Sequence, residues 1–217
     1  MSDAYGLRSD WLEGLAPGQN PEPDPLDPPA ALAGAVLGFE RGASFYYTGG
    51  LVAVHATARD RESIWEALES RRVYGTSGDR ILLHFNLLHG PDGPLPMGSE
   101  VRMDENPRFK VRAAGSLKQK PGCPDWARDG LPADRLTRLC RDECYNPSDE
   151  RRNIVAIEVI RIRPQQTPDE GIDLLIEDPW MRHDCAPDAN GCMFEFEDPE
   201  YVDSGRDALY YARALEE

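Results

Sequence analysis

The chain has 217 residues and a formal net charge of -15 at pH 7, with 40% hydrophobic and 29% charged residues. This length is enough to bury a substantial core, and the composition is that of a globular protein with one large domain or two small ones. The negative charge argues against binding to nucleic acid or to an anionic membrane, and no stretch approaches the roughly 20 apolar residues of a membrane span.

The N-terminal part of the chain predicts an extended surface segment. Residues 17–30 contain six prolines, and proline fixes φ and removes an amide donor, which excludes regular helix or sheet there. Only a short apolar and aromatic piece precedes this segment, and no signal peptide is visible after Met1. We therefore expect the chain to be the C-terminal portion of a longer protein.

Residues 49–87 predict a strand, a helix and a second strand. The run at residues 49–56 is opened by two glycines and continues with apolar residues, which predicts a strand buried on both faces, as in a parallel sheet. Asp60 is a good N-cap for a helix that continues to about Arg72, with its apolar side chains at helical spacing. A turn at residues 74–78 then leads into a strand at residues 81–87.

From about residue 98 the pattern changes to a period of two. Apolar and basic residues alternate at residues 108–113, which predicts a half-exposed strand. Further strands are expected at residues 154–162, 174–177, 193–197 and 209–215, with a short helix around residues 133–139. Short strands separated by turns favour an antiparallel sandwich, and residues 207–211 resemble a tyrosine corner ending at Tyr211.

Five cysteines lie in turn-rich sequence of the second half, which favours disulfides in an oxidising compartment. The close pairs are Cys140 with Cys144 and Cys185 with Cys192. Cys123 is left over, and its partner is Cys140, Cys144 or none. The alternatives are free thiols and a zinc site that recruits His183 beside Cys185, although these spacings match no standard zinc motif.

The sequence offers few candidates for catalysis. The four histidines form no His-x-His or His-Glu-x-x-His pair, and no nucleophile elbow or phosphate loop is present. His55 lies at the C-terminal end of a predicted strand, where α/β barrels place their site residues; the alternative is a histidine hydrogen-bonded at a sheet edge. Thr76, Ser77 and Arg80 have the groups to bind an anion, or they simply end the helix and begin the next strand.

Several stretches together resemble domain-of-unknown-function family 3604, which is similar to the PHP (polymerase and histidinol phosphatase) superfamily of distorted α/β barrels. The most specific parts of this resemblance are the long helix and turn segment, the Pro-Gly-Cys-Pro stretch that contains Cys123, and the Glu-Cys-Tyr stretch that contains Cys144. The resemblance is carried by residues 49–81, 98–99, 115–124, 143–149, 157–165, 176–180 and 205–214.

The resemblance implies a longer, often exported protein whose earlier part is a barrel with His-x-His and Asp-x-His metal ligands. Asp3 is followed by Ala-Tyr rather than x-His, so no metal ligand is carried over to this chain. The family often has an aromatic residue at the position of His55, so His55 is not expected to be an obligatory ligand.

We therefore expect an α+β chain in two parts. Residues 1–89 would be the terminal strand–helix–strand piece of a PHP-like barrel, and residues 90–217 a mostly antiparallel, sandwich-like region braced by disulfides. The intact protein would be a periplasmic or extracellular hydrolase that uses a divalent metal to cleave a phosphoester or related bond of a small-molecule substrate. Without the missing N-terminal barrel portion, this chain would hold no cofactor and be inactive. The alternative is a non-enzymatic, extracytoplasmic β-sandwich binding module.

Overall fold

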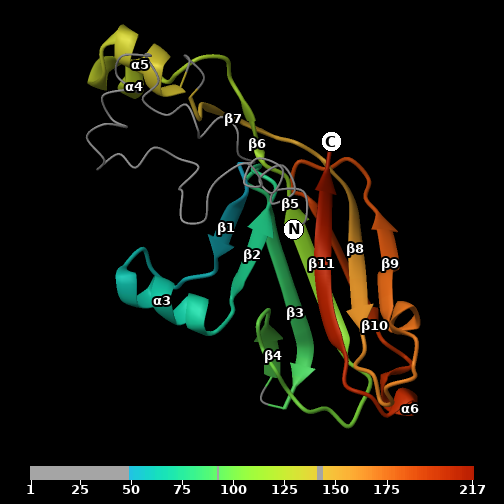
Figure 1. The fold of residues 1–217 in the computed structure, drawn as a ribbon. Helices are drawn as coiled ribbons and strands as arrows, with labels where there is room; N and C mark the ends of the chain where they lie inside the picture. The colour runs from blue at the N-terminus through green and yellow to red at the C-terminus, as the bar shows by residue number, and fades with distance from the viewer. Residues whose placement is uncertain (1–48, 92, 141–143) are drawn as a thin grey trace, which may run out of the picture. The chain divides into compact units, whose positions relative to one another are not determined.

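The computed structural model describes residues 49–217, with the exception of 92 and 141–143 (Figure 1). The proline-rich segment at residues 17–30 lies outside the described residues. The chain divides into two compact units. The smaller consists of Met1–Gly50 and Gln119–Ser148, and the larger of Leu51–Lys118 and Asp149–Glu217.

The larger unit contains two antiparallel sheets that enclose one hydrophobic core (Figure 1). This confirms the expected β-rich, mostly antiparallel architecture. One sheet has the strand order β10-β5-β3-β4 and the other β11-β8-β9. Their bounds are β3 (Leu82–Gly90), β4 (Gly93–Pro96), β5 (Arg108–Ala114), β8 (Ile154–Ile162), β9 (Ile176–Asp184), β10 (Cys192–Glu197) and β11 (Leu209–Glu216).

The core forms because alternate residues of each strand point to the same side. In β5, Phe109, Val111 and Ala113 are buried, as the period of two predicted. They meet Ile157 and Val159 of β8, which are fully buried in the facing sheet. Aromatic rings pack within and between the layers: the Phe109 ring lies 5.2 Å from that of Phe196 in the same sheet and 4.7 Å from that of Tyr210 in the facing sheet.

The segment before the sandwich differs from the expected parallel unit. β1 (Leu51–Val54) leads through α3 (Arg61–Glu69) to β2 (Val73–Thr76), and β2 pairs antiparallel with β1. The predicted cap is confirmed, since the Ser63 amide donates to Asp60 Oδ1 over 2.8 Å. Arg71 has φ 56°, a left-handed conformation directly after the helix, and the chain then returns along β1.

The prediction of a parallel strand buried on both faces was therefore wrong for β1. Val52 is 68% exposed, and the described residues form no closed barrel. An apolar run does not distinguish a buried strand from one that leaves its side chains in solvent, and no other feature of these residues indicated that β1 is exposed. The expected boundary after residue 89 falls within β3. This strand pairs with β5 of the later segment and therefore belongs to the sandwich.

Other boundaries also shift, most of all at β9, which was expected at residues 174–177 and extends to Asp184, and β4 was not predicted. The expected turn at residues 74–78 begins within β2, and Leu174 lies in a 3-10 turn, Ile172–Leu174, before β9. A short helix, α6 (Tyr201–Ser204), precedes β11. The hydrogen-bonded phenol near the expected tyrosine corner is that of the half-buried Tyr210, which donates to a carboxylate, while Tyr211 is exposed. None of the described helices is both long and apolar enough to cross a membrane.

The smaller unit carries the described helices α4 (Asp125–Gly130) and α5 (Ala133–Cys140); the second was predicted. Ala127 and Leu136 pack with Cys123 in a small core. The chain crosses between the units at β6 (Leu117–Gln119) and β7 (Pro147–Arg151), which form a two-stranded sheet.

Two disulfides are formed, Cys123–Cys144 and Cys185–Cys192. The second was predicted, and it links the end of β9 in one sheet to the start of β10 in the other. The first joins Cys123 to Cys144, one of the partners left open for Cys123, so the close pair of Cys140 with Cys144 is not formed. The Lys120 amide donates to the Asn146 carbonyl over 2.7 Å, and this contact brings the two chain segments together so that the cysteines beyond it meet.

Candidate functional site

His55 follows β1 and lies beside a second histidine. Its Nε2 is 2.9 Å from the Leu83 carbonyl oxygen, and its ring centre is 4.7 Å from that of His84 and 5.4 Å from that of Tyr74. Tyr74 donates to the Ile81 carbonyl over 2.8 Å. These contacts are those of a histidine hydrogen-bonded at a sheet edge, and its part in an active site stays a prediction.

Partial burial lowers the pKa of His84 below its usual 6.5, although the residue is still exposed at the surface, and the charges of His55 and then Arg112 lower it further. A depressed pKa means that the folded state resists protonation, so stability is expected to fall as the pH drops below about 6.5. Replacing His55 with glutamine should return the pKa of His84 only part of the way to 6.5, because burial of His84 is the larger cause of the lowered pKa. A histidine NMR titration checks this, and an unchanged pKa of His84 in the variant would contradict the coupling.

The other predicted site residues lie in the turn after β2. The Thr76 hydroxyl accepts a hydrogen bond from the Gly78 amide over 3.3 Å, so it serves the turn itself. Ser77 and Arg80 are exposed. Their use as an anion site stays a prediction.

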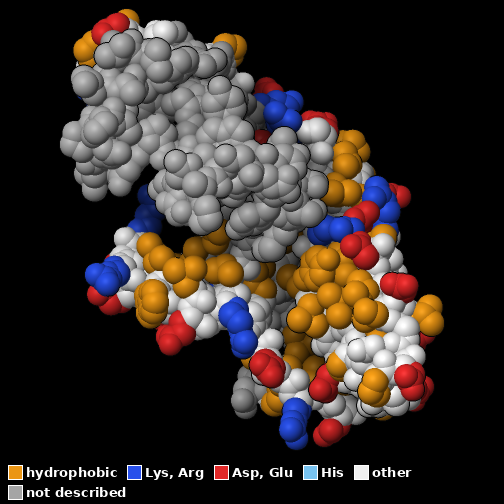
Figure 2. All heavy atoms as spheres, in the orientation of Figure 1, with side chains coloured by type: hydrophobic (Ala, Val, Ile, Leu, Met, Phe, Trp, Pro, Cys, Tyr) orange, Lys and Arg blue, Asp and Glu red, His pale blue; other side chains and the backbone are white. Residues whose placement is uncertain are grey.

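Apolar side chains gather on the surface formed by α3 and β1, as Figure 2 shows. The side chain of Trp65 is 67% exposed and that of Val52 is 68% exposed. Ala67 is the buried residue of α3, so most of the apolar side of this helix is left exposed. We call this the α3–β1 surface; its exposed members are Leu51, Val52, Ile64, Trp65 and Leu68.

An open hollow of about 470 Å³ lies beside the C-terminal end of α3. Arg71 and Glu100 both line it and pair across 3.6 Å. Gly98 also lines it, with φ 84°, and a Cβ there would come within 2.4 Å of the Arg71 carbonyl oxygen. Glycine is therefore required where the two chain segments pass so closely.

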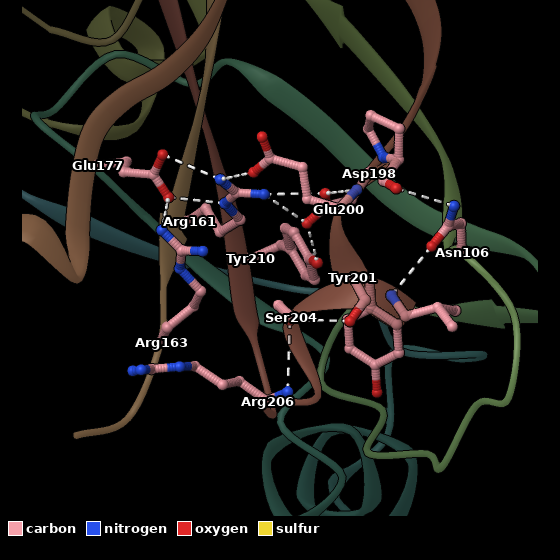
Figure 3. A network of polar contacts seen from close by, with 12 residues as sticks. Asn106, Arg161, Arg163, Glu177, Asp198, Glu200, Tyr201, Ser204, Arg206 and Tyr210 are labelled. Carbon is pink, nitrogen blue, oxygen red and sulfur yellow. Dashed lines mark hydrogen bonds and ion pairs between the residues drawn. The ribbon is translucent and has the colours of Figure 1, made fainter. Parts of the chain in front are cut away.

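A buried ion-pair network lies between the sheets around Arg161 of β8 (Figure 3). The side chains of Arg161 and Asp198 are 3% and 1% exposed. Arg161 donates to both oxygens of Glu177, to both oxygens of Asp198, and to Glu200, at 2.7–2.9 Å. Its guanidinium also lies 4.5 Å from the centre of the Trp180 ring, an arrangement suited to a cation–π contact.

The charges of this network are neutralised from several elements. Burial by itself lowers the pKa of Arg161, but the hydrogen bonds of the three carboxylates outweigh it and raise that pKa above its usual value. Asp198 also accepts from the Tyr210 hydroxyl over 2.6 Å and from the Glu200 amide over 3.0 Å. Burial and its hydrogen bond to Asp198 raise the pKa of the Tyr210 hydroxyl. Since these groups are satisfied by one another, the arrangement braces the fold rather than presenting a free acid or base.

Sequence reasoning did not identify this network, although one signal was available. Arg161 shares its side of β8 with the inward-facing Ile157 and Val159, so its position in the strand predicts a buried charge. A buried guanidinium needs carboxylate partners, but Asp198 and Glu177 lie in other strands and loops, and the sequence does not say which acids reach it.

His183, Cys185 and Cys192 come together at one end of the sandwich. Their ligand atoms lie within 4.8 Å of one another. The His183 ring stacks on that of Phe194, with ring centres 4.6 Å apart and planes 12° apart. Among the residues that the structure describes, this is the group of three or more histidine, cysteine or acidic side chains that is close enough to hold a metal ion.

Residues 31–115 match the model of a family described as a protein of unknown function, DUF3604. The matched segment contains the α3–β1 surface, His55 and the turn after β2. An uncharacterized protein of Chlamydia pneumoniae is 38% identical over 75 residues, which make up 34% of this chain and 12% of that protein. The aligned part is therefore a small share of the relative. No solved structure matches the chain significantly.

Proposed function

We propose that this chain is an accessory β-sandwich module of a longer, PHP-like, metal-dependent hydrolase. In this proposal the α3–β1 surface docks on the preceding, barrel-forming portion of the protein. The observation that carries the proposal is the group of exposed apolar side chains on α3 and β1, inside the segment that matches the family model.

Single exposed apolar residues are common, but several of them on two neighbouring elements are typical of an interface. Fully burying an exposed apolar side chain contributes roughly 1.5–3 kcal/mol, and Val52, at 68% exposure, has most of that burial left to gain. A tryptophan is a frequent anchor at such interfaces, and Trp65 is the largest side chain of this surface. Another portion of a longer protein is the favoured occupant because this chain aligns with only 12% of its relative, and the family resemblance implies that this portion is a preceding barrel.

The hydrolytic chemistry is assigned to the preceding portion of the full-length protein. A divalent metal there would supply an activated water for attack on a phosphoester or related bond of a small-molecule substrate. The histidine pair in the family-matched segment does not fit that role: His55 and His84 have no third ligand beside them, and Nε2 of His55 bonds a backbone carbonyl. We therefore expect this chain by itself to be inactive.

We also propose a periplasmic or extracellular location. Two disulfides in one chain are typical of proteins in an oxidising compartment. Export also agrees with the family resemblance of the sequence.

The docking proposal is tested with the native gene. The portion that precedes this chain is expressed separately, and its binding to this chain is measured by calorimetry. The double variant Val52→Ser, Trp65→Ser should weaken binding at least tenfold. Trp126→Ser is the matched control, because Trp126 is 75% exposed but lies in the smaller unit, and it should bind as the wild type does.

Activity is measured in the same samples with a generic phosphodiester and added divalent metal. Turnover should require the preceding portion, and this chain alone should give none. Equal binding by the double variant would refute the α3–β1 surface as the docking site. Turnover by this chain alone with stoichiometric metal, or a native gene without a preceding portion, would refute the accessory role.

The alternative function, an extracytoplasmic binding module, is favoured by a second exposed surface. Ile176, Leu209 and Tyr211 lie on the outward side of the sheet β11-β8-β9, where they face away from the core. Figure 2 shows hydrophobic side chains gathered over this sheet. If Leu209→Ser abolished capture of a protein partner while the α3–β1 variant did not, the binding-module function would replace the accessory role.

A further inference from the structure

We propose that Cys185, Cys192 and His183 form a zinc site when the disulfide between the two cysteines is reduced. The pair would thus exist in two states: a covalent cross-link between the sheets under oxidising conditions, and a zinc cross-link between the same strands under reducing conditions. This inference is independent of the proposed hydrolase role.

Strand geometry brings the three ligands together. His183 and Cys185 are two positions apart at the end of β9, so their side chains point to the same side. The Cys185 amide donates to the Val155 carbonyl over 2.9 Å, which continues the ladder beyond β9. Cys192 begins β10, opposite Ala113 of β5. All three residues therefore rest on paired strands rather than on the loop between them.

The distances require only a local change. In a tetrahedral zinc site, with Zn–S of about 2.3 Å and Zn–N of about 2.0–2.1 Å, the ligand atoms lie about 3.5–3.8 Å apart. The ligand atoms here already lie within 4.8 Å of one another. The Cα atoms of the two cysteines are 5.9 Å apart, so rotation of the side chains separates the sulfurs without moving the strands. The stacking of His183 on Phe194 holds the imidazole in place.

The turn that joins the ligands is itself well defined. Asp188 Oδ1 accepts from the Asn190 amide over 2.8 Å, and the Gly191 amide donates to the Asp188 carbonyl over 3.0 Å. Gly191 has φ 95°, and a Cβ there would come within 2.1 Å of the Ala113 carbonyl oxygen. The position immediately before Cys192 therefore requires glycine, and the approach of Cys192 to Cys185 is fixed by the backbone.

The chemistry balances with a dithiol as reductant. The reductant transfers two electrons and two protons, the Sγ–Sγ bond breaks, two thiols form, and the dithiol becomes a disulfide. Zinc binding then releases the two thiol protons, because the thiolate is the ligand. Two thiolates and one imidazole favour Zn²⁺ over Mg²⁺ or Ca²⁺, which prefer oxygen ligands. Water occupies the fourth position, as in zinc sites with three protein ligands.

The test uses the full chain with the substitutions Cys123→Ser, Cys140→Ser and Cys144→Ser, so that Cys185 and Cys192 are its only thiols. Zinc is titrated anaerobically against a chromophoric chelator, before reduction and after reduction with a phosphine that is then removed. One zinc per chain is expected in the reduced protein and none in the oxidised protein. Cobalt in place of zinc should give the absorption of a tetrahedral site with thiolate charge transfer.

His183→Gln should weaken zinc binding at least tenfold in the reduced protein. Asp184→Asn is the matched control, since Asp184 is the exposed acid between His183 and Cys185, and it should leave the affinity unchanged. If the triple variant fails to fold, the same two substitutions are compared in the reduced wild type, where His183→Gln should remove one zinc equivalent. Absence of zinc binding after reduction, or equal affinity with and without His183, would overturn the proposal.

Discussion

Replacing Arg161 with methionine is expected to lower the free energy of unfolding by roughly 3–5 kcal/mol, because it leaves buried carboxylates without their cation. Asp198 is the decisive partner, since its side chain is 1% exposed and loses two hydrogen bonds from Arg161. Glu177, at 28% exposure, loses a bidentate partner but keeps its contact with Arg163 at 3.3 Å. Methionine fills much of the volume, so the loss is mainly electrostatic.

Arg213→Met is the matched control for this change. Arg213 also pairs with two carboxylates, those of Glu158 and Asp178, but its side chain is 41% exposed. Water and salt screen such pairs, so its loss is expected to cost about 0–1 kcal/mol. Urea unfolding of both variants, followed by tryptophan fluorescence, measures the difference. A similar loss of unfolding free energy for the two variants would show that burial does not determine how much the Arg161 network stabilises the fold.

Replacing Phe109 with alanine is expected to lower the free energy of unfolding by roughly 3–5 kcal/mol. Phe109 is 8% exposed, and its ring contacts those of Phe85, Phe196 and Tyr210. Its removal opens a cavity between the two sheets that rigid strands cannot fill. The same change also removes packing beside Tyr210, whose hydroxyl donates to Asp198.

Met193→Ala provides the comparison on the neighbouring strand. Met193 pairs in register with Arg112 and is largely exposed on the outer side of the same sheet, so truncation is expected to change stability by less than about 0.5 kcal/mol. Thermal unfolding monitored by circular dichroism checks both variants. A small effect of Phe109→Ala would mean that the sheets are held chiefly by other contacts.

Much of the sandwich was predictable because the decisive pattern is local. The alternation around Phe109 and Val111 follows from the two-residue period of a strand, whatever the strand packs against. The Asp60 cap and the helix after it also depend on a few neighbouring residues. The same local reasoning failed for β1, because an apolar run indicates a strand but not the direction of its partner or the burial of its faces.

The sequence by itself indicated several strands of the β-rich region, the helix after Asp60, and Cys185 with Cys192 as a candidate pair. Only the tertiary structure decided that Cys123 pairs with Cys144, that β2 returns antiparallel along β1, and that Asp198 neutralises Arg161. These features join residues that are distant in the chain or compete with nearer partners, and contact between them depends on which segments the fold brings together. For the same reason, the position of His183 beside both cysteines depends on β9 and β10 lying in facing sheets.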